Sequence, residues 1–206
     1  MPVRNSRKQY TPDSYYHVYS RGVNRQAIFR DDQDYRVFLG YLKRYLSAKP
    51  GRKATRQVVR GYHDEIELLA YCLMSNHIHL LFYQHENERA VQEVMQRILT
   101  TYSMYFNRRY DRCGPLFQGR YLASRIDNDG YLLHISRYIH LNPKLWRDYK
   151  YSSLVYYLSK KHSDWVRPKR IMEIFHEQST DYEKFLADYE PKRDELEQIK
   201  TNLANN

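Results

Sequence analysis

The order of apolar and polar positions along the chain predicts alternating strands and helices. A first strand is expected over residues 15–20, and a helix then begins at Asp31 or Asp32 and ends near Ser47. Aspartate is a favoured N-cap residue, and the apolar residues after it recur at helical spacing. They are Tyr35, Phe38, Leu39, Leu42, Tyr45 and Leu46. Pro50-Gly51 stops this helix, and a basic segment leads to the next strand, with Lys49, Arg52, Lys53, Arg56 and Arg60.

The pattern after residue 60 predicts two adjoining strands, a long helix, a fourth strand and a further helix. The two strands cover residues 65–73 and the apolar run that opens at His77, and a hairpin at residues 74–76 joins them. A helix over residues 88–109 is broken by Gly114-Pro115, and the fourth strand covers residues 118–126. The last helix lies between an N-cap at Asp127 or Asn128 and Pro143, because the residue before a proline is biased away from helix.

This order, β-α-β-β-α-β followed by a helix, is that of the ferredoxin-like α+β fold. Such an antiparallel sheet carries its two helices on one face, and we expect the other face to be open. We divide the chain into a polar basic arm (residues 1–13), a main domain (residues 14–158) and an acidic helical extension (residues 159–206). In the extension, Pro168 is expected to begin a short helix over residues 169–177. A charged helix over residues 181–190 either braces the main domain or is mobile.

Two histidines open the third strand, in the run Ser75-Asn76-His77-Ile78-His79-Leu80-Leu81-Phe82. Successive side chains of a strand point to opposite faces, so His77 and His79 share one face while Ile78, Leu80 and Phe82 share the other. The apolar side fits the helix-covered face, which places the histidines on the open one. Two imidazoles at this spacing can bind one divalent metal ion. The alternative is a pair of half-exposed histidines with no ligand.

The helix before Pro143 carries a second group of candidate residues. Its apolar residues recur at roughly helical spacing: they are Tyr131, Leu132, Ile135, Ile139 and Leu141. Tyr138 and Asn142 lie four residues apart and therefore on one helix face. A phenol nucleophile and an amide oxygen at these positions could both reach a metal ion held by His77 and His79. The alternative is an amphipathic helix in which the tyrosine only packs.

Four blocks of the sequence together resemble the REP-associated tyrosine transposases, a domesticated branch of the single-tyrosine, His-hydrophobic-His transposases. The blocks are Tyr16-His17-Val18-Tyr19-Ser20-Arg21-Gly22 with Asn24-Arg25-Gln26-Ala27-Ile28-Phe29, then Ser75-Asn76-His77-Ile78-His79-Leu80-Leu81, then Gly114-Pro115-Leu116-Phe117-Gln118-Gly119-Arg120-Tyr121, and Tyr138-Ile139-His140-Leu141-Asn142-Pro143. They stand in the order and at the spacing of that family, over roughly residues 14–158. Beyond about residue 160 the resemblance ends.

The resemblance implies a single-strand DNA endonuclease and strand-transferase that acts on REP-type palindromic hairpins. Tyr138 would be the catalytic nucleophile and would form a 5′-phosphotyrosine link, leaving a free 3′-hydroxyl. His77, His79 and Asn142 would be the ligands of a metal ion that polarises the phosphate. Two imidazoles and an amide suit Mg²⁺ or Mn²⁺, whereas a catalytic zinc site usually has three His, Glu or Cys ligands.

The charge of the chain favours a polyanionic partner. Its 206 residues include 34 Lys and Arg against 24 Asp and Glu, a net charge of +10, which is typical of nucleic-acid-binding proteins. Residues 177–206 have a net charge of −4, so residues 1–176 carry +14 and are expected to hold the DNA surface. The expected DNA-binding residues are Arg21, Asn24, Arg25, Arg108, Arg109, Arg112, Gln118 and Arg120.

Aromatic residues lie among these basic residues. Tyr105, Tyr110 and Tyr121 could stack on unpaired bases, which favours single-stranded or hairpin DNA over duplex DNA. Three alternatives remain at this level: a solvated basic surface without a partner, tyrosines that only pack, and a turn-stabilising role for Asn24.

Cys72 and Cys113 fit no metal or disulfide pattern. The first residues do not resemble a signal peptide, and no apolar run is long enough to span a membrane. We therefore expect a cytoplasmic, nucleoid-associated protein, either a monomer or a homodimer. The alternatives to the domesticated enzyme are a mobile insertion-sequence transposase of the same superfamily, a hairpin-binding protein with vestigial nuclease activity, and a zinc-structured regulator. The lack of paired cysteines argues against the last of these.

Overall fold

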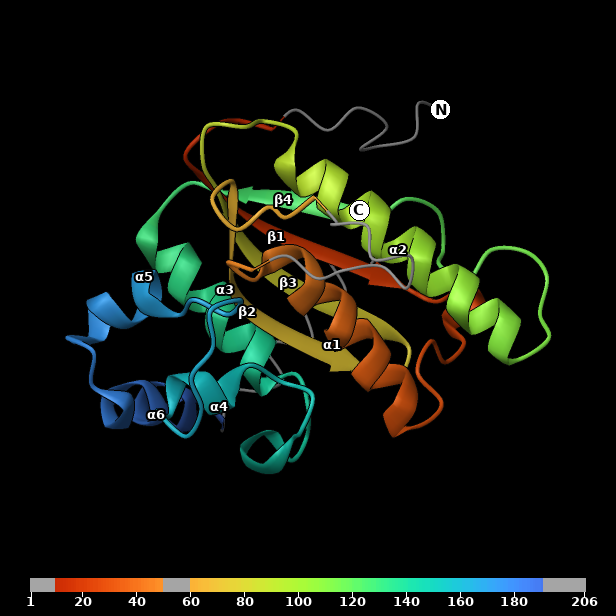
Figure 1. Cartoon of the computed structure of the whole chain (residues 1–206). Coiled ribbons are helices and arrows are strands. Elements are labelled where there is room, and N and C mark those ends of the chain that lie inside the picture. The colour runs from red at the N-terminus through yellow and green to blue at the C-terminus, as the bar shows by residue number, and fades with distance from the viewer. Residues whose placement is uncertain (1–9, 50–59, 191–206) are drawn as a thin grey trace, which may run out of the picture.

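The chain folds around a four-stranded antiparallel sheet with the strand order β2-β3-β1-β4 (Figure 1). The computed structural model describes residues 10–49 and 60–190. The strands are β1 (Ser14–Arg21), β2 (Ile66–Met74), β3 (His77–Gln84) and β4 (Leu122–Ile126), and the helices between them are α1 (Asp32–Leu46) and α2 (Ala90–Arg109). The predicted ferredoxin-like β-α-β-β-α-β fold is confirmed.

The elements after β4 are mostly short helices. They are α3 (Asp129–Leu141), α4 (Leu154–Tyr157), α5 (Lys169–Met172) and α6 (Ser179–Ala187), with single 3-10 turns at Trp146–Asp148 and Glu173–Phe175. A further 3-10 turn, Val23–Arg25, lies between β1 and α1. The helix predicted over residues 169–177 is thus split into α5 and a 3-10 turn, and Pro168 precedes α5 as its N-cap residue. The predicted arm up to residue 9, the basic segment at residues 50–59 and the extension after residue 190 lie outside the described residues.

Local sequence signals explain where the main helices begin. The Asp31 side chain accepts hydrogen bonds from the backbone N–H groups of Gln33 and Asp34 at the start of α1. Asn128 does the same for Tyr131 at the start of α3, over 2.8 Å. Both residues cap donors that the first helical turn leaves unsatisfied. The fourth strand is shorter than predicted, because the left-handed Gly119 (φ +67°) turns the chain just before it.

The two faces of the sheet are both covered. On one face, α1 and α2 pack against Val18, Leu80 and Phe82, and Figure 1 shows these two helices side by side on that face. The other face is not open, contrary to our expectation, because α3 to α6 pack on it. Its apolar residues Cys72 and Leu81 lie in one core with side chains of α3 and α6. These residues need cover because β2 is apolar on both of its sides.

Candidate active site

The four side chains predicted to carry the chemistry lie together on the face covered by α3. His77 is the first residue of β3, and His79 points to the same face two residues later. The Tyr138 hydroxyl lies 3.3 Å from Nε2 of His79, and Oδ1 of Asn142 lies 3.3 Å from Nε2 of His77. Tyr138, His79 and Asn142 are buried, while His77 is partly exposed. Within the chain, the group is therefore assembled from β3, α3 and the C-cap residue of α3.

A buried hydrogen-bond network anchors helix α3 and thereby fixes the position of Tyr138. His140 lies two residues after Tyr138, and its Nδ1 and Nε2 atoms are each 2.7 Å from a hydroxyl oxygen, of Tyr182 on α6 and of Ser153. Ser153 in turn accepts the backbone N–H of Tyr71 on β2. Burial lowers the pKa of His140 to about 3, so its ring is neutral at physiological pH. The network ties the helix to both the sheet and the C-terminal segment.

The protonation of His77 follows from its neighbours. The amide nitrogen of Asn76 donates to the carbonyl of Arg25, so Oδ1 of Asn76 faces Nδ1 of His77 at 2.6 Å. A neutral His77 then carries its proton on Nδ1. Its Nε2 lone pair faces the carbonyl oxygen of Asn142, and the amide nitrogen of Asn142 has no hydrogen-bond partner in the described part of the chain. Two lone pairs that face one another at the C-terminal end of a helix fit a bound cation.

This donor set has limited coordinating power. Among the described residues, no group of three or more His, Cys, Asp or Glu side chains is placed to hold a metal ion. The candidate site has two imidazoles and one amide oxygen, so the remaining positions around an ion would belong to water or to phosphate oxygens. Such a set fits a hard, weakly held ion better than a structural zinc ion, which usually has four protein ligands.

The structure adds one residue that our sequence reasoning did not single out. His17 on β1 is fully buried, and its Nε2 lies 3.0 Å from Nδ1 of His79. The two rings stack, with their centroids 5.1 Å apart. Burial lowers the pKa of His17 to about 3, so it is neutral at physiological pH. The available signal was strand alternation, which places His17 on the same side of β1 as Tyr19, the direct β-sheet partner of His79.

Several of the predicted DNA-binding residues meet at the end of the sheet where His77 lies. Arg21 is the β-sheet partner of His77, and its guanidinium donates to the side chain of Gln118 over 2.8 Å. Backbone hydrogen bonds join the loop after β1 to the β2–β3 hairpin (Gly22 to Asn76) and to the segment before β4 (Val23 to Leu116). Asn24 and Arg25 are exposed on this loop. Three segments far apart in sequence thus form one polar rim beside His77.

The remaining predicted DNA-binding residues have different surroundings. Arg108 and Arg120 are exposed, and Arg112 donates to the side chain of Asn107. Asn24 has left-handed backbone angles inside a 3-10 turn, which agrees with the alternative that it stabilises the turn.

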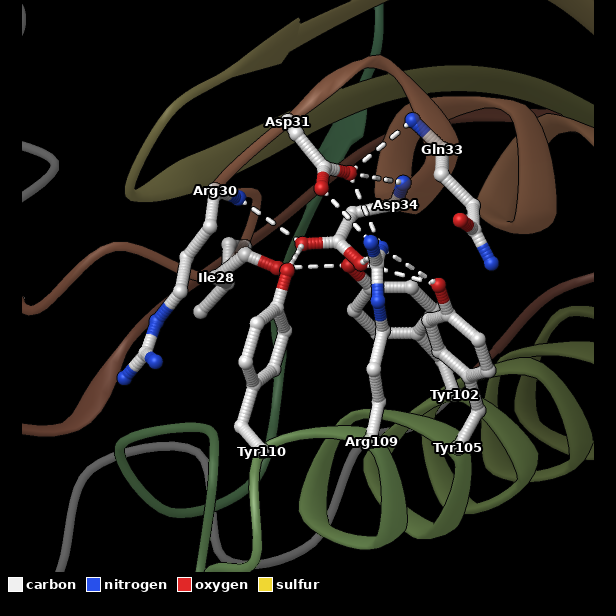
Figure 2. Close-up of polar contacts among 9 residues, drawn as sticks. All are labelled: Ile28, Arg30, Asp31, Gln33, Asp34, Tyr102, Tyr105, Arg109 and Tyr110. Carbon is white, nitrogen blue, oxygen red and sulfur yellow. Dashed lines mark hydrogen bonds and ion pairs between the residues drawn. The ribbon is translucent and has the colours of Figure 1, made fainter.

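Arg109 has a structural role. Figure 2 shows its guanidinium between Asp31 and the fully buried Asp34, with ion-pair distances of 2.6 Å to each. These ion pairs join Arg109 on α2 to the start of α1. Sequence reasoning overlooked this because its partners lie more than 70 positions earlier in the chain.

The three tyrosines that could stack on bases also have partners inside the protein. The hydroxyls of Tyr105 and Tyr110 donate to the carboxylate of Asp34 over 2.9 and 2.8 Å (Figure 2). Tyr121 is buried, and its hydroxyl lies 2.7 Å from that of Tyr10. The structure therefore favours the alternative that these residues pack.

Known proteins are similar to this chain in sequence pattern and in fold. The family model described as "Transposase IS200 like" matches residues 11–142. A solved REP-associated tyrosine transposase bound to a REP hairpin is similar in fold, with a TM-score of 0.56 and 17% sequence identity over 80% of this chain and 92% of that one. A putative transposase from Deinococcus radiodurans R1 matches with a TM-score of 0.39 and 14% identity, over 68% of this chain and 95% of that one. No curated protein matches the sequence.

In the part of the chain that the structure describes, none of the helices has the length and apolar character needed to cross a lipid bilayer. The family model covers more than half of the chain and includes both histidines, Tyr138 and Asn142. The resemblance found in the sequence is thereby confirmed, and the chain belongs to the IS200-like transposase family.

Proposed function

We propose that the protein is a metal-dependent single-strand DNA endonuclease and strand-transferase that acts on REP-type palindromic hairpins. The observation that carries the proposal is the placement of the Tyr138 hydroxyl 3.3 Å from Nε2 of His79, beside the His77–Asn142 pair. A nucleophile, two metal-ligating imidazoles and an amide oxygen are then within reach of one phosphate. The rim that includes Arg21 and Arg25 lies at the same end of the sheet and offers positive charge to a DNA strand.

Tyr138 acts as the nucleophile in this proposal. Its phenol oxygen forms a bond to the phosphorus atom of a phosphodiester, and the bond from phosphorus to the 3′ oxygen breaks. The phenol loses one proton to water, and the departing 3′ oxygen gains one, so a 5′-phosphotyrosine and a 3′-hydroxyl result. The phosphotyrosine link is itself a phosphodiester, so one such bond is formed for each one that is broken. The 3′-hydroxyl can therefore attack the link and rejoin strands without a nucleotide cofactor.

His77, His79 and Asn142 would hold the metal ion, for which Mg²⁺ or Mn²⁺ is the best match to the donor set. When bound, the ion supplies Lewis-acid polarisation of the phosphate and stabilises the charge that develops on the departing oxygen. The residues themselves orient the reaction. Helix α3 fixes Tyr138 and Asn142 with respect to β3. Because Tyr138 is buried and His77 is partly exposed, we infer that a phosphate approaches the Tyr138 hydroxyl from the side of His77.

The proposed substrate is supported by the fold that this chain shares with a REP-associated transposase, which was solved with a REP hairpin. We infer that the rim beside His77 contacts the foot of a hairpin, where unpaired nucleotides adjoin the duplex. Arg21, Asn24, Arg25 and Gln118 form the part of this rim that extends from β1 and the segment before β4. All four predicted catalytic and ligand residues come from one chain, so one copy suffices for cleavage.

The experiment that tests the proposal is adduct formation. Wild-type protein is incubated with Mg²⁺ and end-labelled hairpins that carry single-stranded flanks, and covalent adducts are separated on denaturing gels. Tyr138→Phe removes one oxygen and should abolish the adduct while leaving hairpin binding intact. Tyr131→Phe, in the exposed first turn of the same helix, is the matched control and should keep wild-type yield. An adduct from Tyr138→Phe at wild-type yield would refute the assignment of the nucleophile.

The metal ion and the preference for hairpins are tested separately. His77→Ala and His79→Ala should each abolish cleavage but spare hairpin binding, which depends mainly on basic residues. Chelation of divalent ions should stop cleavage by the wild-type protein, and Mg²⁺ should restore it. A fully paired duplex of the same sequence should compete poorly with the hairpin; equal competition would contradict the proposed recognition of unpaired DNA.

A further inference from the structure

The buried pair formed by His17 and His79 shares a single proton between two ring nitrogens. Nε2 of His17 and Nδ1 of His79 are 3.0 Å apart, and both rings are almost fully buried, at 0% and 4% exposed. Two neutral imidazoles can make this hydrogen bond in only two ways. Either His17 donates from Nε2, or His79 donates from Nδ1.

The choice between these two arrangements decides what His79 can do with its other nitrogen. If His17 donates, the proton of His79 is on Nε2, and that nitrogen cannot bind a metal ion. If His79 donates from Nδ1, its Nε2 has a lone pair. Nε2 is also the atom that lies 3.3 Å from the Tyr138 hydroxyl. Only the second arrangement makes His79 both a ligand and a neighbour of the nucleophile.

We propose that His17 is a positioning residue of this site: its Nε2 accepts the Nδ1 proton of His79 and thereby keeps Nε2 of His79 available to a metal ion. The inference rests on the proposed function, because it assigns His79 as a ligand. Metal-binding histidines commonly donate their second N–H to an acceptor that fixes the tautomer and the ring orientation. His17 provides that acceptor, and the near-parallel stacking of the rings, at an interplanar angle of 24°, limits rotation of His79.

The surroundings of His17 support a specific role over simple packing. Its own Nδ1 is buried and has no hydrogen-bond partner within the described ranges. An aliphatic side chain would fill the same space without leaving a polar atom unpaired, and an unpaired buried polar group is costly. An imidazole at this position is explained if its Nε2 is needed as the acceptor for His79. Ser124, the register partner of His17 on β4, lies on the same face of the sheet.

Two variants distinguish the role of the Nε2 acceptor of His17 from the role of its side-chain volume. His17→Leu has a similar volume but no acceptor, whereas His17→Gln places an amide oxygen near the position of Nε2. We expect His17→Leu to bind Mn²⁺ about 10–100-fold more weakly than the wild type, as measured by calorimetry. His17→Gln should remain within a few-fold. Exposed His162, in the loop after α4, gives the control variant His162→Leu, which should bind Mn²⁺ like the wild type.

Nitrogen NMR of the metal-free protein gives a readout that needs no metal and no DNA cleavage. Long-range proton–nitrogen correlations, assigned with a His79→Ala sample, should show the His79 proton on Nδ1. The proton on Nε2, or a His17→Leu variant with wild-type Mn²⁺ affinity, would overturn the proposal. If the wild type bound no Mn²⁺, the proposed metal site would fail instead. The NMR tautomer, compared between wild type and His17→Gln, would still decide the role of His17.

Discussion

The hydroxyl of Tyr182 offers the clearest test of how the nucleophile helix is held. Tyr182 is fully buried on α6, and its oxygen lies 2.7 Å from Nδ1 of His140 and 3.3 Å from the hydroxyl of Ser136. Both of these partners are on α3, on either side of Tyr138. Tyr182→Phe removes one oxygen and leaves the ring packing almost unchanged, so the loss of these hydrogen bonds is the main effect.

The loss of stability in Tyr182→Phe depends on the His140 nitrogen that stays buried. In Tyr182→Phe, Nδ1 of His140 stays buried without its hydroxyl partner, and an unsatisfied buried polar group typically costs about 1–3 kcal/mol. We expect the free energy of unfolding to fall by roughly 2 kcal/mol, and the melting temperature by about 4–8 °C for a chain of this size. Cleavage should fall as well, because α3 carries the nucleophile, while hairpin binding should not change.

Urea denaturation and thermal melting measure the loss of stability, and the adduct assay measures the loss of activity. Tyr41→Phe on α1 is the matched control, because the Tyr41 hydroxyl has no hydrogen-bond partner among the described residues; its effect should be within about 0.5 kcal/mol. The reasoning is refuted if Tyr182→Phe is as stable as Tyr41→Phe. A stable Tyr182→Phe protein with reduced cleavage would show that the network orients α3 without contributing to the fold.

Three further predictions test other parts of the structure. His140 has a pKa lowered to about 3 by burial, whereas an unfolded histidine binds a proton below about 6.5; stability should therefore be lost as the pH falls from 6.5 towards 3, by about 1.4 kcal/mol per pH unit from this group. Urea titrations at several pH values should show a shallower dependence for His140→Gln. Gly22→Ala should destabilise the loop beside His77, because a Cβ atom there would collide with the carbonyl oxygen of Gln26. Gly40 is exposed on α1 with free space around its Cα, so Gly40→Ala should raise the melting temperature. Arg108→Gln should weaken hairpin binding and reduce its salt dependence by about one ion, while Arg109→Gln should lower the melting temperature and leave that salt dependence unchanged.

Local periodicity was sufficient to predict the two faces of β3 and the geometry of α3. Alternation along a strand put His77 and His79 together, and the i to i+4 relation put Tyr138 beside Asn142. Both rules involve residues that are close in sequence, and both geometries are present in the structure. Our expectation that the sheet face carrying the histidines is open was wrong. The apolar run of β2 was the available signal, because a strand buried on both sides has no alternation.

Contacts between distant segments could not be predicted in the same way. Alternation along β1 gives the face on which His17 lies, but the contact with His79 also depends on the β1–β3 register, which local periodicity does not give. Similarly, the charge of Arg109 gave no indication of whether its guanidinium faces DNA or a carboxylate 75 residues earlier. Composition describes how many charges a chain has, whereas their roles depend on which buried partners the fold brings beside them.

The C-terminal segment is part of the unit that folds. The family match ends at Asn142, yet Ser153, Tyr157 and Tyr182 lie beyond it and complete the core over β2 and α3. A protein that stops at residue 142 would present this apolar surface to water, and exposed apolar surface of that kind promotes aggregation. The sequence block that identifies the family is therefore smaller than the unit that folds. Helices α4 to α6 complete the layer that covers β2 and α3.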